Sequence, residues 1–169
     1  MIKSKDEILI MSEGGKILRR VLDRLSEESQ IGANLLDLND LAYKLIKEAG
    51  ADPAFLGYKP YGAVRPFPNS ICVSLNEVVV HGIPKNYKLK SGDILKIDLG
   101  ILYKKFYTDG AITLGIENTD KKAQDLIKIT KEALGVGISE VRPGNFVGDI
   151  GFVIEKYVTK NKLKIIKGL

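Results

Sequence analysis

Two aspartates, Asp98 and Asp109, stand eleven residues apart in a segment whose apolar residues alternate. The alternation predicts two antiparallel strands that turn between Tyr103 and Lys104, and this register places Asp98 directly opposite Asp109. The Cβ atoms of directly opposed residues lie about 4.5–5.5 Å apart on one face of a sheet. Two carboxylates that close repel each other unless a proton or a cation lies between them. Because paired divalent metal ions commonly fill such sites and serve hydrolysis, the spacing favours a hydrolytic metal centre.

Two other interpretations of these aspartates stay open. A lone aspartate in a strand is usually a solvated surface residue, and a loop of three residues at the turn shifts the register by one and removes the direct opposition. The alternation from Leu95 to Ile101 argues against a solvated surface residue. It makes Asp98 point away from the more apolar face, with Asp109 on the same side. Aspartate is disfavoured inside strands, so two aspartates in register favour a metal site.

A single histidine and a single cysteine limit the other ligands. His81 follows the run Val78–Val80, at the end of a predicted strand. A lone histidine is more often structural than catalytic, so its role depends on its neighbours. Cys72 alone excludes an internal disulfide framework and a cysteine-rich zinc site. A metal bound by this chain would therefore have oxygen and imidazole ligands.

The elements that position these residues are predicted from periodicity. Apolar residues recur at helical spacing through 5–29, which Gly14-Gly15 weakens without ending, and again through 37–49, which Gly50 closes. An irregular loop over 53–70 holds four aromatic residues that could line a pocket: Phe55, Tyr58, Tyr61 and Phe67. The following segments read as strands over 71–75 and 78–80, the hairpin over 93–116, helices over 119–134 and 145–157, and a short strand over 162–167. This order predicts an α+β domain in which helices cover an antiparallel sheet.

Composition limits the class of protein. With 169 residues, of which 44% are hydrophobic, the chain is long enough for one core and one domain. Its net charge is +5, but the lysines are dispersed without interleaved aromatic residues, which argues against a dedicated nucleic-acid site. No apolar run approaches the roughly 18 residues of a membrane span, and the N-terminus lacks a secretory signal. We therefore expect a cytoplasmic protein without a membrane partner.

Three segments are similar to one protein family. Residues 70–84, 91–98 and 106–110 read SICVSLNEVVVHGIP, SGDILKID and FYTDG. In motif, order and spacing the chain resembles type I methionine aminopeptidases along essentially its whole length. The resemblance implies the N-terminal half of the pita-bread (creatinase/aminopeptidase) fold. It also implies a single truncated domain over 1–169, with helices within 5–49, a substrate loop at 53–70, a metal hairpin at 93–116 and helices within 119–157.

The resemblance implies removal of the N-terminal methionine from nascent polypeptides by two-metal hydrolysis. Asp98 would bind one divalent ion, Asp109 would bridge both, and His81 would contact the substrate near the scissile peptide bond. The remaining implied roles are a pocket for the methionine side chain at Tyr58, Phe67 and Cys72, and a monovalent-cation site at Asn76 and Val78. Because the loop around Tyr58 is longer than is common in the family, Tyr61 stays an alternative to Phe67.

The implied cofactors are two divalent ions (cobalt, manganese, iron or zinc) and one monovalent cation; the nascent-chain substrate leaves association with the ribosome open. The family's other metal ligands, one histidine and two glutamates, come from its second half, and nothing here matches them. We therefore expect a chain that is inactive alone, with an uncovered apolar face that favours self-association. Two alternatives are a non-catalytic binding module of the same fold and a homodimer in which a second copy replaces the missing half.

Overall fold

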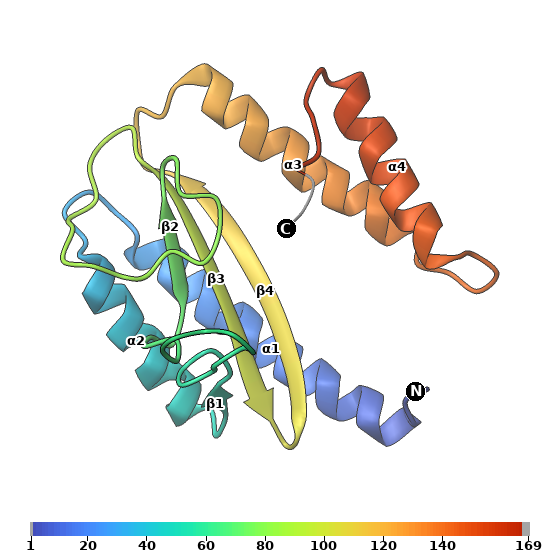
Figure 1. The fold of residues 1–169 in the computed structure, drawn as a ribbon, viewed down its shortest axis with the longest axis horizontal. Helices are drawn as coiled ribbons and strands as arrows, with labels where there is room; N and C mark the ends of the chain where they lie inside the picture. Colours follow the sequence, from blue (N-terminus) through green and yellow to red (C-terminus); the bar gives the residue numbers. More distant parts are fainter. Residues whose placement is uncertain (1, 167–169) are drawn as a thin grey trace. The chain divides into compact units, whose positions relative to one another are not determined.

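The computed structural model describes residues 2–166 and divides them into two compact units, one ending at Thr119 and the other beginning at Asp120. The predicted α+β class is confirmed (Figure 1). The first unit holds α1 (Lys5–Glu28), α2 (Leu35–Glu48), β1 (Asp52–Pro53), β2 (Cys72–Leu75), β3 (Ile94–Tyr103) and β4 (Phe106–Gly115). The second unit holds α3 (Lys121–Ser139) and α4 (Val147–Lys160).

Strand β3 is the centre of an antiparallel sheet. It pairs with β4 along its whole length, with β2 over residues Leu95–Asp98, and with the short β1 over Ile101–Leu102. Because residues on a strand alternate between faces, Leu95, Ile97, Leu99 and Ile101 point to one side and are fully buried there. The opposite side, which we call the pocket face, carries Cys72, Ser74, Lys96, Asp98, Gly100, Asp109 and Ala111.

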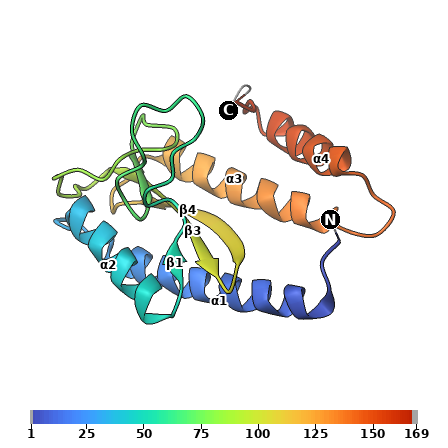
Figure 2. The same cartoon turned by 60° about the horizontal axis from the view of Figure 1, so that its bottom comes forward.

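Helices α1 and α2 cover the apolar face of the sheet, as Figure 2 shows. Helix α1 begins with a capping box, in which Ser4 accepts from the Glu7 backbone and the Glu7 carboxylate accepts from the Ser4 backbone. The predicted weak point at Gly14-Gly15 does not interrupt it. A Cβ at Gly14 would lie 3.4 Å from Thr108 of β4, so this glycine brings the helix close to the hairpin.

The second unit is a helical hairpin. Asp120 caps α3 by accepting a hydrogen bond of 2.9 Å from the backbone N–H of Ala123. Helices α3 and α4 pack where Gly137 leaves room for Ile154, and the Tyr157 hydroxyl donates to Glu132 at 2.9 Å. Both predicted helices in this part of the chain are confirmed. Across residues 2–166, no helix combines the length and the apolar character that crossing a membrane requires.

Two predicted strands are wrong. Residues 78–80 form no strand and are exposed, because Asn76 takes a left-handed backbone (φ 50°) and the Val78 N–H closes a turn onto the Leu75 carbonyl. Residues 163–166 have no regular structure after the turn at the end of α4, and Lys167 lies outside the described residues. In both cases β-branched residues without a neighbouring strand gave the misleading signal.

Candidate metal and substrate site

The hairpin of β3 and β4 turns one residue later than expected, between Lys104 and Lys105, which shifts the pairing register by two residues. Lys104 and Lys105 both have positive φ (46° and 75°) and form a two-residue loop between the paired residues Tyr103 and Phe106. This loop places Asp98 opposite Ala111, not opposite Asp109, so the predicted direct pairing is wrong. A shift of two residues keeps the same face, and the two aspartates are therefore diagonal neighbours on the pocket face.

Gly100 makes room for the second carboxylate. It pairs directly with Asp109, and a Cβ at position 100 would lie 3.0 Å from Asp109 Oδ2 and 3.0 Å from Phe55 Cε1. Since real Cβ atoms are rarely that close to a neighbour, a larger residue would displace one of these groups. The missing side chain at Gly100 therefore lets the Asp109 carboxylate lie over β3, beside Asp98.

The two carboxylates differ in exposure, because Asp98 is half-buried and Asp109 is exposed. Burial raises the pKa of Asp98 and the nearby Asp109 raises it further, while His81 lowers it. Burial also raises the pKa of Asp109. Asp98 Oδ1 is buried and has no hydrogen-bond partner within residues 2–166. A buried, unpartnered carboxylate oxygen beside a second carboxylate fits the donor set of a divalent cation.

The aspartate pair is an incomplete ligand set. Among the described residues, no group of three or more histidine, cysteine, aspartate or glutamate side chains could hold a metal ion. His81 is near enough to influence Asp98, but it does not complete such a group. The described part of the chain therefore offers two carboxylates to a metal.

Cys72 lies directly opposite Asp98 on β2 and is buried and free. Burial, with contributions from Asp98 and Asp109, raises the pKa of its thiol to about 12. The side chain therefore stays protonated at neutral pH. It acts as a small, polarizable part of the wall rather than as a nucleophile or a thiolate ligand.

His81 stands at the end of a loop that is anchored to β2. The next residue, Gly82, donates to Ser74 Oγ at 3.0 Å, and its carbonyl accepts from the Val73 N–H at 2.8 Å. A Cβ at Gly82 would lie 2.2 Å from the Val73 carbonyl oxygen, so only glycine fits there. His81 itself has a left-handed backbone (φ 56°), a strained conformation that often marks functional positions.

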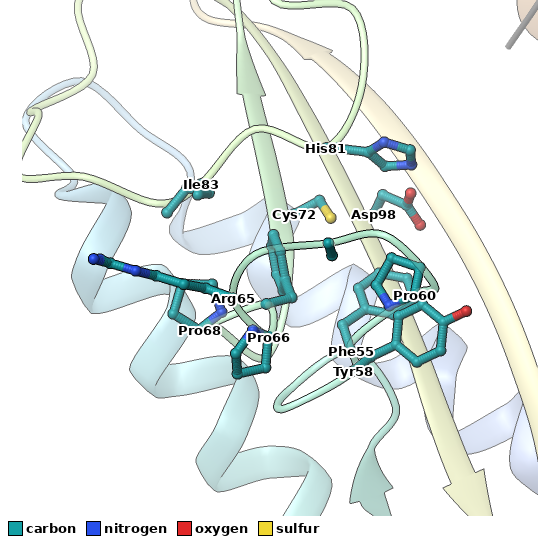
Figure 3. Close-up of a pocket in the computed structure, with 12 residues that line it drawn as sticks. Phe55, Tyr58, Pro60, Arg65, Pro66, Pro68, Cys72, His81, Ile83 and Asp98 are labelled. Carbon is teal, nitrogen blue, oxygen red and sulfur yellow. The ribbon is translucent and has the colours of Figure 1, made fainter.

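A pocket of about 620 Å³ opens beside these groups, with His81, Asp98 and Cys72 close together on one side of it (Figure 3). The three residues predicted to hold a methionine side chain, Tyr58, Phe67 and Cys72, all line it. Tyr61 is fully exposed and does not line it, so the structure brings Phe67 to the pocket and leaves Tyr61 outside.

Backbone hydrogen bonds join the two ends of the loop that carries Phe67. The Phe67 N–H donates to the Tyr58 carbonyl at 2.8 Å, and the Phe67 carbonyl accepts from the Gly57 N–H at 2.9 Å. Its ring meets Phe55 edge to face, with centroids 6.4 Å apart. These contacts hold the aromatic walls of the pocket in place without a regular element.

The turn after β2, where a monovalent cation was expected, is occupied by protein groups. The side chain of Asn76 donates to Asp93 at 2.9 Å and accepts from the Ile94 N–H at 2.8 Å. The backbone carbonyl oxygen of Asn76 accepts a hydrogen bond of 2.7 Å from Lys96 Nζ. Burial lowers the pKa of the Lys96 ammonium, and Glu77 raises it. Cation binding by Asn76 and Val78 stays a prediction.

Several residues of the site were missed from the sequence. Phe55 was grouped with the loop aromatics, but Arg65 and Ile83, which also line the pocket, gave no signal of their own. Gly100 was detectable in principle, because a glycine inside a strand often marks a close approach of another group. Lys96 gave no signal, since its contact joins residues twenty positions apart.

Comparison with known proteins matches residues 10–169 to the model of metallopeptidase family M24. A methionine aminopeptidase of Clostridium perfringens is 37% identical over 167 residues, which cover 99% of this chain and 65% of that protein. A methionine aminopeptidase of Helicobacter pylori is 38% identical, with coverages of 99% and 64%. The chain thus spans about 65% of the length of the curated relatives that it matches.

Solved structures give the same result. The crystal structure of methionine aminopeptidase from Rickettsia prowazekii superposes with a TM-score of 0.92 at 34% identity, over 98% of this chain and 64% of that one. A prolidase from Pyrococcus horikoshii, at 20% identity and a TM-score of 0.80, shares the fold.

Proposed function

Because the chain belongs to metallopeptidase family M24, we propose that it is the part of a methionine aminopeptidase that supplies two aspartate metal ligands and the pocket for the substrate's first side chain. The chain has the pita-bread fold of methionine aminopeptidases, as expected, over 64% of the Rickettsia prowazekii chain. The proposed substrate is the N-terminal methionine of nascent polypeptides, in the cytoplasm. The observation that carries the proposal is the unpartnered Asp98 oxygen, which lies beside a second carboxylate and at the edge of an apolar pocket.

Asp98 and Asp109 would hold the divalent ions, with cobalt, manganese, iron and zinc as the candidates. Ions bound there would polarise the scissile carbonyl and lower the cost of the charge that develops on its oxygen. The chain's own contribution is to present two carboxylates on one rigid hairpin. The close approach at Gly100 and the long β3–β4 pairing fix their positions.

His81 and the pocket would position the peptide. The imidazole lies on the same side of the pocket as Asp98 and can donate or accept a hydrogen bond near the scissile amide (Figure 3). The pocket walls are aromatic rings, prolines and the protonated Cys72 thiol. An unbranched thioether suits such walls, because it is flexible and makes favourable contacts with aromatic rings and sulfur.

The described residues alone should not sustain catalysis. Two carboxylates bind a divalent ion weakly, because affinity rises with ligand number and preorganisation. We therefore propose that further ligands come from polypeptide other than the described residues, and that the 169-residue chain has little or no peptidase activity by itself.

Self-association and contact with the ribosome belong to the same proposal. Apolar side chains near His81 are exposed: Val78, Val79, Val80 and Ile83. A surface of this kind favours burial against another protein surface.

The proposal is tested by titrating the metal-free chain with Mn²⁺ in a calorimeter. We expect weak binding that Asp98→Asn and Asp109→Asn each abolish. Asp23→Asn, which changes an exposed carboxylate of α1 that is paired with Arg19, should bind Mn²⁺ as the parent chain does. Binding that survives both pocket-face variants would overturn the assignment of the ligands.

Activity and stoichiometry separate the alternatives. Chelator-sensitive release of methionine from a Met-Ala peptide by this chain alone would contradict the proposed inactivity. No Mn²⁺ binding at all would support a non-catalytic binding module. Tight binding of two ions per dimer would support a homodimer with shared sites.

A further inference from the structure

The Asn76 turn presents one carbonyl oxygen to the pocket face. The other polar groups of Asn76 are used within the fold: its N–H donates to the Ile94 carbonyl at 2.8 Å, and its side chain joins Asp93 to the Ile94 N–H. These bonds fix the left-handed backbone of the turn (φ 50°). Carbonyl oxygens that are fixed in this way are typical ligands of monovalent cations, because they replace water in the hydration shell.

Lys96 brings a positive charge to this oxygen. It stands on β3 between Ser74 of β2 and Thr113 of β4, and its half-buried side chain reaches back along the sheet to the turn. Its Nζ donates to the Asn76 carbonyl oxygen at 2.7 Å, and among residues 2–166 this is the hydrogen bond that the oxygen accepts. Burial lowers the pKa of the Lys96 ammonium, and the neighbouring Glu77 carboxylate acts in the opposite direction without outweighing burial.

We propose that the ammonium group of Lys96 is a tethered cation that takes the place of a bound monovalent ion at the Asn76 turn. An ammonium group is a compact point charge with three donors, so one covalently attached group can do what a free potassium or sodium ion does at a carbonyl oxygen. The residues therefore do not fit a free monovalent ion while Lys96 holds this position. The turn is stabilised by an internal charge and needs no ion from solution.

The contact between Lys96 and the turn also affects the candidate site, because Asn76 begins the loop that ends at His81. The other end of this loop is fixed by the hydrogen bonds between Gly82 and β2. Lys96 is thus a positioning residue for the loop. Its role is independent of the proposed peptidase activity, since it concerns how the loop is held.

The test compares the thermal stability of the 169-residue chain in potassium, sodium and choline chloride at one ionic strength. Choline is too large to coordinate the turn. We expect the parent chain to have the same Tm in all three salts. Lys96→Met should lower the Tm in choline by about 2–4 °C, the scale of a loss near 1 kcal/mol for a chain of this size. Potassium or sodium should restore at least half of that loss, and the recovery should grow with the logarithm of the ion concentration.

Two further variants control for charge. Lys96→Arg keeps a cation at the turn and should stay insensitive to the identity of the salt. Lys88→Met removes an exposed lysine and should behave as the parent chain. A parent chain that is itself stabilised by potassium or sodium over choline would overturn the proposal. So would a Lys96→Met chain whose stability is equal in all three salts.

A second readout does not depend on melting. The ²³Na resonance of a sodium solution should be broadened by Lys96→Met, and potassium should reverse the broadening. The parent chain and Lys88→Met should leave the line unchanged. Equal broadening by the parent chain and by Lys96→Met would show that the turn binds sodium despite Lys96 and would also overturn the proposal.

Discussion

Asp109 lies opposite Gly100, so that its carboxylate occupies the space where a side chain at position 100 would be. The two aspartates of the pocket face are therefore diagonal neighbours, and their separation is set by the glycine between them. A metal pair would be held by Asp98 of β3 and by Asp109 of β4, which pairs with the residue two positions after Asp98. Asp98 is half-buried between Cys72 and Ala111. The geometry of the site therefore depends on Gly100 as well as on Asp98 and Asp109.

Replacing Gly100 by alanine should damage the metal site more than the fold. The new methyl group would lie 3.0 Å from Asp109 Oδ2 and 3.2 Å from Ala54 Cβ, so the carboxylate must move. We expect Gly100→Ala to weaken Mn²⁺ binding by about 10–100-fold, the usual range for changes next to metal ligands. The overpacking should also cost about 1–3 kcal/mol of unfolding free energy. Calorimetric titration and urea unfolding measure the two effects.

Gly15→Ala is the matched control. This glycine lies within α1, and a Cβ there would have no atom within 4 Å. Alanine should therefore stabilise the helix by up to about 1 kcal/mol and leave Mn²⁺ affinity unchanged. An unaltered affinity in Gly100→Ala would contradict the role given to this glycine.

The thiol of Cys72 should react slowly in the folded chain. Its pKa is raised to about 12, so at pH 8 almost no thiolate is present. An unfolded cysteine has a pKa of about 8.5, and we therefore expect alkylation by iodoacetamide to be at least about a hundredfold slower in the folded chain than in urea. Because Cys72 is the only cysteine, total labelling reports on this site alone.

A charge variant tests the cause of this slow reaction. Asp98 adds to the effect of burial on the Cys72 pKa. Asp98→Asn should therefore label faster than the parent chain at pH 8, while Asp23→Asn should label at the parent rate. Equal rates in the folded and urea-unfolded chains would show that the thiol is not protected.

The sequence predicted the face of the site but not its register. Because side chains alternate between the two faces of a strand, any register shift by an even number of residues keeps Asp98 and Asp109 on one face. The predicted shared face was therefore correct although the predicted register was wrong by two residues. The register depends on the turn, and Lys104-Lys105 lacks the asparagine and glycine that usually announce a two-residue loop with positive φ. That information is absent from local composition.

Long-range contacts account for the other differences. The amphipathic pattern predicted α1 and α2 well, and Gly50 marked the end of α2, because helix formation depends on nearby residues. The position of His81 depends instead on the fit of Gly82 against Val73, and the run Val78–Val80 is exposed because no strand is available beside it. Neither fact can be read from the residues next to them in the chain.

Asp93 should make the stability of the first unit depend on acidic pH. Burial raises the pKa of this carboxyl, but hydrogen bonds from Asn76, the Lys90 N–H and Tyr87 outweigh burial, and the pKa is below its ordinary value. A lowered pKa in the folded chain means that the ionised form favours folding. Its contribution is complete above the unfolded pKa of about 3.9 and is lost as pH falls from there through the folded pKa.

Asp93→Asn should lower the unfolding free energy at pH 7 by about 1–3 kcal/mol and flatten its fall below pH about 4. Tyr87→Phe removes one donor, at 3.0 Å, and should give an intermediate profile. Urea midpoints measured from pH 7 to pH 3 provide the comparison. A steeper acid transition in Asp93→Asn than in the parent chain would reverse the sign and contradict the argument.

The hairpin turn offers a stabilising substitution. Lys105 has φ 75°, a left-handed backbone that costs a residue with a Cβ about 1–2 kcal/mol and costs glycine little. Its neighbour Lys104 is engaged with Glu13 at 3.3 Å and is better left unchanged. Lys105→Gly should therefore raise the unfolding free energy by about 1 kcal/mol in urea titrations, less the entropy that glycine adds to the unfolded chain. Lys44→Gly, within α2, should lower it by a similar amount, because a helix interior disfavours glycine. If both variants were destabilised equally, the positive φ at Lys105 would not be a source of strain.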